Sequence, residues 1–246
     1  MLIKTLCDYY DILSEEEKVL PDGYSNVKIH YLISLTPEGK IDGILDCQEK
    51  KSEQTGKGKQ KEKKFPRDMI MPQRTEKPGI DPNIADHRPL YIFGLNLTEE
   101  GLTPDDRTNK ARKSHQAFVE ANLSFTEGLD SPVIQAFRNF LQNWKPEEER
   151  ENPYLFGLKK DYGKSGYAFC LSGNPDLLLH DDPQFKRKWE LEYQKQQGED
   201  LLFSQCAVTG EKKAIARIHN KIKGVYGGLA TGSVLIGFNN PSERCV

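Results

Sequence analysis

Hydrophobic residues recur at helical spacing near the start of the chain, over residues 2–13. Such positions gather on one face of a helix, so this segment predicts a short amphipathic helix that opens the fold. We interpret Tyr9 and Tyr10 as residues that pack in or beside a core rather than stack on a base, because aromatic stripes at helical spacing usually face a core.

Two apolar segments with strand character follow a turn at residues 21–24. Residues 27–35 and 41–47 each predict a strand, and Pro-Glu-Gly-Lys at residues 37–40 predicts the turn of a hairpin between them. Residues 49–66, in contrast, contain almost no apolar side chains and many lysines. Such a composition cannot bury enough surface to order itself, so we expect a mobile Lys-rich loop there.

The later part of the chain alternates helices and strands. Five prolines between residues 66 and 94 disfavour a helix and favour an extended path. Beyond them the pattern predicts a strand, two helices, a strand and a helix, over residues 90–95, 105–123, 131–144, 167–171 and 184–197. Together these elements predict an α+β fold with a mixed, largely antiparallel sheet, flanking helices and long basic loops.

The overall charge does not by itself indicate a nucleic-acid-binding protein. Charged residues make up 29% of the 246 residues but the formal net charge is only -2, so such a role requires local basic patches. The five cysteines lack Cys-x-x-Cys spacing, which argues against a disulfide framework and a zinc ribbon. No apolar run is long enough to span a bilayer, and the N-terminus lacks signal-peptide features. We therefore expect a soluble, cytoplasmic protein that does not contact a membrane.

The lysines of residues 49–66 form the first local basic patch. They are either a solubilising loop or a nonspecific contact to phosphates, and the composition leaves both interpretations open. Lysines that neutralise phosphates release counterions and add affinity without reading sequence. The candidate phosphate contacts are Lys57, Lys59, Lys61, Lys63 and Lys64.

A second basic patch lies in residues 204–240, where lysines lead into a glycine loop. Glycines let a backbone approach a ligand closely, and loop N–H groups flanked by lysines suit a phosphate-bearing partner. The polar side of this segment carries Arg217 and His219, and Lys221 and Lys223 continue it. His219 has no nucleophile or carboxylate pair at a recognisable spacing, so we interpret it as a phosphate or core hydrogen-bonding residue rather than an acid–base catalyst.

His180, Asp181 and Asp182 stand next to one another and raise the question of a metal or acid–base site. No second histidine lies at helical distance, and Asp182 followed by Pro183 is typical of a helix N-cap and first helical residue. We therefore favour a capping role. The alternative is a metal-dependent nuclease or phosphodiesterase that uses these three residues together with His219.

Three motifs occur in a fixed order within residues 205–239: Gln-Cys-x-Val-Thr-Gly-Glu, then Ile-Ala-Arg-x-His-x-x-Ile-Lys-Gly-Val-x-Gly, then Thr-Gly-Ser-x-Leu-x-x-Phe-Asn. Together they resemble the large subunit of the type I-C CRISPR surveillance complex, Cascade. Asp-Tyr-Tyr-Asp at residues 8–11, Gly-Ile-x-Pro-Asn at 79–83 and Leu-His-Asp-Asp-Pro at 179–183 extend the resemblance. It covers nearly all of the chain.

The resemblance implies a noncatalytic subunit of an RNA-guided antiviral defence complex, without a cofactor or a bound metal. Such a subunit binds double-stranded target DNA, recognises the protospacer-adjacent motif and assists duplex opening. Its implied partners are the target DNA, the CRISPR guide RNA, the backbone and guide-handle-binding Cascade subunits, and a recruited helicase-nuclease that cleaves the strand. Family members continue into a mostly helical C-terminal portion, so we expect residues 1–246 to be the N-terminal domain, with that part absent.

The resemblance also assigns the candidate site residues. An asparagine after proline usually shapes a turn, but the resemblance favours a ligand contact for Asn83, since an amide can donate and accept at a minor-groove edge. The chain departs from the family pattern at residues 84–87 and 229–231, and Leu229 is either a wedge that unstacks base pairs or a residue that packs its loop. The expected DNA-binding residues are Asn83, Arg74, Lys57, Lys59, Lys61, Lys63, Lys64, Arg217, His219, Lys221, Lys223, Gly227, Gly228, Leu229, Thr231 and Ser233. A further interpretation is a scaffold that contacts only guide RNA and neighbouring subunits.

Overall fold

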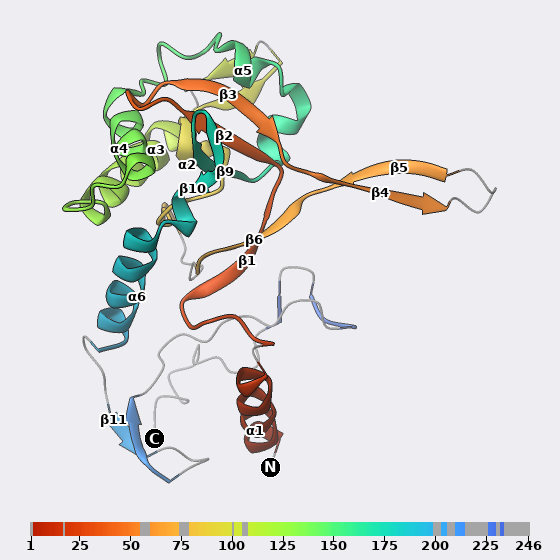
Figure 1. Ribbon diagram of the computed structural model, residues 1–246, viewed down its shortest axis with the longest axis vertical. Helices are drawn as coiled ribbons and strands as arrows, with labels where there is room; N and C mark the ends of the chain where they lie inside the picture. Colours follow the sequence, from red (N-terminus) through yellow and green to blue (C-terminus); the bar gives the residue numbers. More distant parts are fainter. Residues whose placement is uncertain are drawn as a thin grey trace. The chain divides into compact units, whose positions relative to one another are not determined.

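A computed structural model describes residues 2–16, 18–54, 60–73, 79–99, 101–104, 108–198, 203–205, 210–214, 226–229 and 232–233 (Figure 1). The chain divides into two compact units, residues 17–193 and residues 1–16 with 194–246, and each is described by itself. Helices combined with mixed and antiparallel strand pairs confirm the predicted α+β class.

The larger unit is organised around a four-stranded sheet in the order β10-β9-β2-β3. Its strands are β2 (Tyr31–Leu35), β3 (Ile41–Asp46), β9 (Tyr167–Leu171) and β10 (Asn174–Leu178). β2 pairs antiparallel with β3 and parallel with β9, and β9 pairs antiparallel with β10. The sheet is therefore mixed and largely antiparallel, as predicted, and the hairpin predicted over residues 27–47 is confirmed for β2 and β3.

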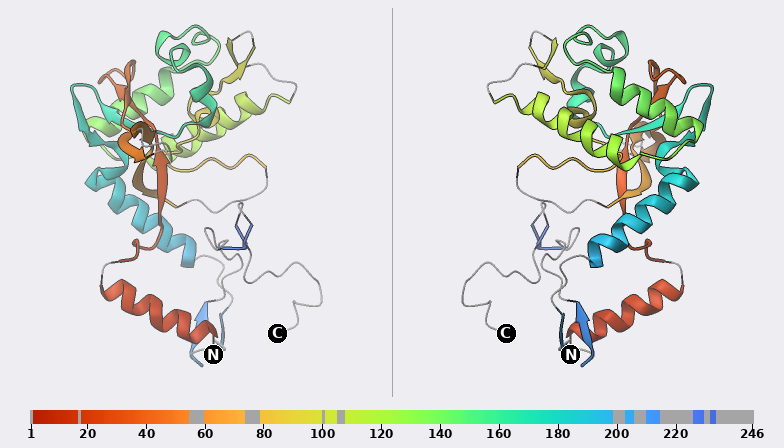
Figure 2. Two further views of the ribbon diagram at one scale, coloured as in Figure 1. Left: turned by 90° about the vertical axis from the view of Figure 1, so that its right-hand side faces the viewer. Right: turned by 90° about the vertical axis from the view of Figure 1, so that its left-hand side faces the viewer.

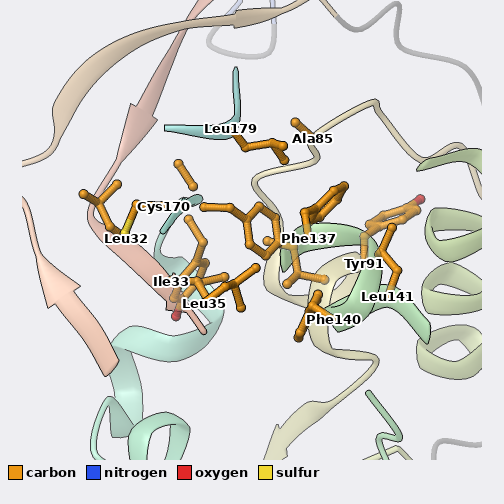
Figure 3. Close-up of a cluster of buried hydrophobic side chains, with 14 of the residues drawn as sticks. Leu32, Ile33, Leu35, Ala85, Tyr91, Phe137, Phe140, Leu141, Cys170 and Leu179 are labelled. Carbon is orange, nitrogen blue, oxygen red and sulfur yellow. The ribbon is translucent and has the colours of Figure 1, made fainter. Parts of the chain in front are cut away.

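Three helices pack beside this sheet: α2 (Pro89–Phe93), α3 (Lys110–Phe125) and α4 (Pro132–Asn143). The helix α4 contacts β2 and β9, and α3 packs against α2 and α4. Figure 2 shows α3 and α4 running side by side. The apolar stripe of α4 points at the sheet, where the rings of Phe137 and Phe140 lie 4.7 and 5.6 Å from that of Phe169 on β9. All three rings are fully buried and belong to the same hydrophobic core cluster. Figure 3 shows Phe137 and Phe140 in this cluster together with Ile33 and Leu35 of β2.

The turn between β2 and β3 is pressed against α4. Gly39 adopts a left-handed φ of 82°, and a Cβ atom at this position would lie 2.2 Å from the backbone nitrogen of Phe140. The amide of Asn139 on α4 donates to the carbonyl of Pro37 at 2.7 Å, and Asn143 donates to Glu38 at 3.2 Å. Only glycine combines this φ with this close approach.

Two strand predictions are corrected by the structure. The single strand expected over residues 27–35 is interrupted at His30, and its first half belongs to β1 (Tyr24–Ile29), which pairs antiparallel with β6 (Arg67–Pro72). The strand expected over residues 90–95 is instead the short helix α2. The apolar run there carries no periodicity, and Pro89 at the first turn with Gly94 as a left-handed C-cap selects the helix.

Several short elements and one long helix complete the larger unit. They are β7 (Asn96–Thr98), β8 (Gly101–Thr103), α5 (Pro153–Phe156) and the 3-10 helices η1 (Lys159–Lys164) and η2 (Leu179–Asp181). The helix α6 (Pro183–Gly198) confirms the prediction for residues 184–197 and continues past the boundary of this unit. Trp189 of α6 is buried and donates through its indole nitrogen to the carbonyl of Gly23 at 2.8 Å.

The smaller unit contains the helix α1 (Leu2–Glu15) and the paired strands β11 (Phe203–Gln205) and β12 (Lys212–Ala214). The predicted N-terminal helix is confirmed. Its tyrosines, however, do not reach a core, because Tyr9 is 57% and Tyr10 46% exposed. No helix in the described part of the chain is both long and apolar enough to cross a bilayer.

Candidate nucleic-acid interface

The lysines of residues 49–66 lie on a two-stranded antiparallel ribbon, in which β4 (Glu49–Gln54) pairs with β5 (Gln60–Phe65). The expected mobile loop is thereby corrected for the described residues of this segment. Backbone pairing forms the ribbon without a buried side-chain face, because β4 continues from β3 and β5 leads into β6, which are both already paired. In Figure 1 this lysine ribbon projects away from the main sheet.

The register of the lysine ribbon sorts its side chains onto two faces. Lys51 lies opposite Lys63, next to Phe65, and Lys50 lies opposite Lys64 on the other face. The ammonium nitrogens of Lys51 and Lys63 lie 5.9 and 5.2 Å from the ring centroid of Phe65. One face therefore presents two cations around a half-buried aromatic ring, and the other presents a facing pair of lysines.

Two ion pairs on the lysine ribbon are exposed to solvent. Lys51 pairs with Glu49 at 3.2 Å, and Lys64 pairs with Asp46 at the end of β3. The side chains of all four residues are between 35% and 64% exposed, so solvent screens both pairs and keeps them weak. Such weak pairs leave these lysines able to exchange their carboxylate partners for phosphates.

The structure places only part of the predicted lysine set. Lys63 and Lys64 are exposed on β5, and Lys61 occupies the β5 position opposite Glu53. The predictions for Lys57, Lys59 and Arg74 fall outside the described residues. Sequence reasoning missed Lys50, Lys51 and Phe65 as parts of the same surface. The sequence signal for this surface is the alternation of charged residues before and after the central glycines of the segment. Such alternation has the period of a β-strand.

Asn83 is held inside a turn by both ends of its side-chain amide. Its Nδ2 group donates to the carbonyl of Pro72 at 2.9 Å, and its Oδ1 atom accepts from the backbone N–H of Ile84 at 3.0 Å. The amide of Asn122 on α3 also donates to the Asn83 carbonyl at 3.2 Å. Turn formation thus accounts for this geometry, and contact between Asn83 and DNA stays a prediction.

A buried carboxylate organises the rest of that turn. Asp86 is fully buried and accepts from the backbone N–H of Asn83 at 2.9 Å, and from both the backbone N–H and the Nε of Arg88 at 2.9 Å. The Arg88 guanidinium also pairs with the second oxygen of Asp86, donates to the carbonyl of Asp81 at 2.9 Å and lies 3.7 Å above the ring of Tyr91. The turn that carries Asn83 is therefore rigidly braced.

The residues of the alternative metal site have other roles. Asp182 accepts from the backbone N–H groups of Gln184 at 2.9 Å and Phe185 at 3.2 Å, which confirms it as the N-cap of α6. His180 is buried, and burial lowers its pKa to about 4. Asp181 pairs with Lys186 at 2.7 Å. Among the residues that the structure describes, no three His, Cys, Asp or Glu side chains are arranged to hold a metal ion.

The described part of the glycine loop is a closed turn. The N–H of Leu229 donates to the Ser233 hydroxyl at 3.1 Å, and the N–H of Gly232 donates to the Leu229 carbonyl at 2.9 Å. Gly227 has a left-handed φ of 79°, and the side chain of Leu229 is 69% exposed. Gly228 belongs to the same described stretch, whereas the predictions for Arg217, His219, Lys221, Lys223 and Thr231 lie outside the described residues.

Comparison with known proteins identifies a family whose model matches most of this chain. The family model of the CRISPR-associated protein Cas_Csd1 matches residues 6–243 of the 246-residue chain. A search of curated proteins finds no match. The family match spans the lysine ribbon, the Asn83 turn and the glycine loop alike. The chain therefore belongs to the CRISPR-associated Csd1 family, the large-subunit family of the type I-C Cascade complex.

Proposed function

We propose that this chain binds double-stranded target DNA, recognises the protospacer-adjacent motif and assists duplex opening within the RNA-guided type I-C complex. The observation that carries the proposal is the lysine ribbon, a projecting two-stranded structure with lysines on both faces (Figure 1). A two-stranded ribbon has dimensions that the major groove admits, and lysines supply the sequence-independent part of DNA affinity.

Spacing along the lysine ribbon also suits a phosphate backbone. Residues two apart on a strand lie about 6.8 Å apart on one face, so lysines at such positions can each contact a separate phosphate. Lys61 and Lys63 of β5 occupy such positions. Lys51, opposite Lys63, widens the cationic face, and the ring of Phe65 beside it adds a surface for apolar contact to a sugar or base.

Motif reading and duplex opening are assigned to the Asn83 turn and the glycine loop. Asp86 and Asn122 fix the Asn83 backbone, and the Pro72 carbonyl and the Ile84 N–H orient its amide. Preorganised polar groups are what base-edge recognition requires. The exposed Leu229, held at the start of a hydrogen-bonded turn, has the character of an apolar wedge. Opening by a wedge costs unstacking energy, which the lysine contacts offset.

We assign no catalytic step to this chain. Strand cleavage belongs to the recruited helicase-nuclease, while the guide RNA and the backbone and guide-handle-binding subunits complete the assembly. The His180, Asp181 and Asp182 group already serves the start of α6, so it supplies no open ligand set for nuclease chemistry. Intact DNA after incubation with magnesium or manganese is the expected result, and metal-dependent loss of DNA would favour the nuclease alternative.

Charge removal on the lysine ribbon tests the DNA-binding part of the proposal. The triple variant Lys50→Gln, Lys51→Gln and Lys63→Gln keeps unbranched polar side chains and the ribbon backbone but removes three cations. The plot of log affinity for duplex DNA against log salt concentration has a negative slope. We expect the magnitude of this slope to decrease by about 0.9 for each phosphate that these lysines neutralise. The matched control carries Lys40→Gln, Lys145→Gln and Lys160→Gln, three exposed lysines away from the ribbon. Equal slopes for both triple variants would refute the role of the ribbon.

Motif reading requires a control for the structural role of Asn83. The variant Asn83→Ala removes the amide but also loosens the turn, because it deletes the hydrogen bond to the Pro72 carbonyl. Asn122→Ala disturbs the same turn from α3 and keeps the Asn83 amide. Binding to duplexes that differ only in the flanking motif separates the two. Loss of preference in Asn83→Ala alone supports direct reading, whereas no preference in the unmodified chain favours the scaffold interpretation.

A further inference from the structure

A cavity of about 700 Å³ opens beside the corner between β1 and β2, lined also by α2, by the start of β7 and by the end of η1. Its volume lies within the range of about 300–1,000 Å³ that is typical of small-molecule sites. None of the sequence motifs pointed to it, because its lining residues come from segments around residues 28, 90 and 165 that the fold brings together. The hydrogen bonds that join these segments include those from His30 and Tyr31 N–H to the Gly166 carbonyl at 2.8 and 3.2 Å.

The chemical character of the cavity is divided between an apolar wall and a cationic rim. Pro89, Leu90, Leu95 and Leu97 supply the apolar wall. Lys28 and Lys164 stand at the rim, and both residues are exposed. None of the described residues that line the cavity is acidic. This combination suits a ligand with a flat apolar part and an attached anion.

The residues that line the cavity carry a net positive charge. Arg88 also lines it, but its charge is balanced by the buried Asp86. Lys28 lies 3.9 Å from Asp68 of the neighbouring strand, and the two side chains are 71% and 59% exposed, so this pair is weak and exchangeable. Asp161 and Asp46 also act electrostatically on His30 of the cavity wall, and Asp46 is itself paired with Lys64. An anion at the rim therefore encounters the charges of Lys28 and Lys164, with Asp161 as the nearby opposing charge.

Polar groups that fix an orientation complete the cavity. His30 accepts a hydrogen bond from the Gly166 N–H at Nδ1, at 3.1 Å, and burial lowers its pKa, so it lines the wall as a neutral ring. The buried Tyr162 donates its hydroxyl to the Leu95 carbonyl at 2.9 Å, which holds its ring in place. A neutral imidazole and fixed aromatic and apolar surfaces are what an unpaired nucleobase meets in single-strand recognition.

We propose that this cavity binds one unpaired nucleotide of a nucleic acid strand, with the base against Leu90 and Leu97 and its phosphate between Lys28 and Lys164. The inference rests on the proposed nucleic-acid function but uses a different surface from the lysine ribbon. A base must leave its stack to enter such a site, so the cavity favours single strands over duplex DNA. The strand is either RNA or DNA, since both carry the required base and phosphate.

Photocrosslinking tests this site in the full chain. The probes are two short single strands of the same sequence, one RNA with a single 4-thiouridine and one DNA with a single 4-thiothymidine, together with a duplex that contains the same DNA strand. We expect crosslinks from a single strand to map to residues 87–97 or 162–166 and to disappear in the double variant Lys28→Gln, Lys164→Gln. Crosslinks to the RNA or to the DNA alone would identify the source of the nucleotide and support the site in either case.

Affinity measurements provide a second readout that does not depend on photochemistry. Removing the two lysines that neutralise phosphates should lower the salt slope for the preferred single strand by about 1.4, which is about 0.7 for each lysine. Leu97→Ser, at a partly exposed wall position, should weaken single-strand binding without changing that slope. The ribbon control Lys50→Gln, Lys51→Gln, Lys63→Gln should retain the cavity crosslinks.

Two outcomes separate the failure of this inference from the failure of the proposed function. If single-strand crosslinks and affinity are unchanged in Lys28→Gln, Lys164→Gln, the cavity is not a nucleotide site, whatever the lysine ribbon does. If the cavity crosslinks appear and vanish as expected while the ribbon variant binds duplex DNA normally, the nucleotide site stands and the duplex-binding proposal fails.

Discussion

Removing the Asp86 carboxylate is the sharpest test of the turn that carries Asn83. Asp86 is fully buried and accepts hydrogen bonds from two backbone N–H groups, of Asn83 and Arg88, and from the Arg88 guanidinium. Asp86→Ala deletes every one of these acceptors at once. The Arg88 side chain, only 26% exposed, then keeps its charge without the partner that balances it.

The expected cost follows from these interactions. Breaking a buried ion pair by removing one partner costs about 3–5 kcal/mol, and each backbone N–H left without an acceptor adds about 1–3 kcal/mol when it is buried. Because Arg88 retains some solvent contact and its guanidinium still donates to the Asp81 carbonyl, we place the total at the lower end of the summed ranges, at about 5 kcal/mol. That is a large share of a total stability of about 5–15 kcal/mol.

Urea unfolding followed by circular dichroism measures this cost directly. The matched control is Asp176→Ala, an exposed aspartate on β10, for which the change should stay within about 0.5 kcal/mol. Asp86→Asn separates charge from hydrogen bonding, because it keeps one acceptor oxygen, and it should fall between the control and Asp86→Ala. A destabilisation below about 1 kcal/mol for Asp86→Ala, within the range of an ordinary single hydrogen bond, would refute the bracing role.

Further predictions concern a turn, a buried histidine and the thiols. Gly39→Ala should lower the free energy of unfolding, measured by heat or urea, by well over the value of about 1–2 kcal/mol that we expect for Gly128→Ala. Both glycines have a left-handed φ, but only at Gly39 would the new Cβ atom collide with α4. His180 binds a proton below about pH 6.5 in the unfolded chain but only below about pH 4 in the native chain. The free energy of unfolding should therefore fall by about 3 kcal/mol as the pH drops from 6.5 to 4, and His180→Leu should flatten that decline. Iodoacetamide should label the exposed Cys7 well before Cys170 in the native chain, as judged by peptide mass mapping, because Cys170 is buried and burial raises its pKa to about 11; equal labelling would contradict its burial.

Local signals were sufficient for most of the regular elements. Apolar periodicity predicted α1, α3, α4, α6 and the β2–β3 hairpin, and the Asp182-Pro183 pair predicted the start of α6. Periodicity failed where tertiary pairing decides the outcome. The lysine-rich segment has no apolar face to bury, yet it forms strands because its neighbours β3 and β6 are already paired. The apolar run at residues 90–95 predicts a strand, although the proline before it and the glycine within it favour the helix that forms at Pro89–Phe93.

The candidate site was only partly accessible to sequence reasoning. The sequence showed that Asn83 is a polar residue in a turn, but its hydrogen bond to the Pro72 carbonyl depends on β6 ending beside the turn, which local sequence does not reveal. Asp86 and Arg88 are only two residues apart, so the Asp-His-Arg sequence was sufficient to predict their ion pair. The cavity between Lys28 and Lys164 was not, because only the parallel pairing of β2 with β9 brings residues 28–31 beside residues 163–167.

The facing lysines of the ribbon have a consequence for how salt acts on this protein. Lys50 opposes Lys64 and Lys51 opposes Lys63, so like charges repel across the paired strands. Added salt screens that repulsion and should tighten the strand pairing in the free chain, while the same salt weakens attraction to a polyanion. A bound nucleic acid strand supplies the screening itself. Ribbon order and ligand occupancy are thus thermodynamically linked, and amide hydrogen exchange in β4 and β5 should slow on binding most strongly at low ionic strength.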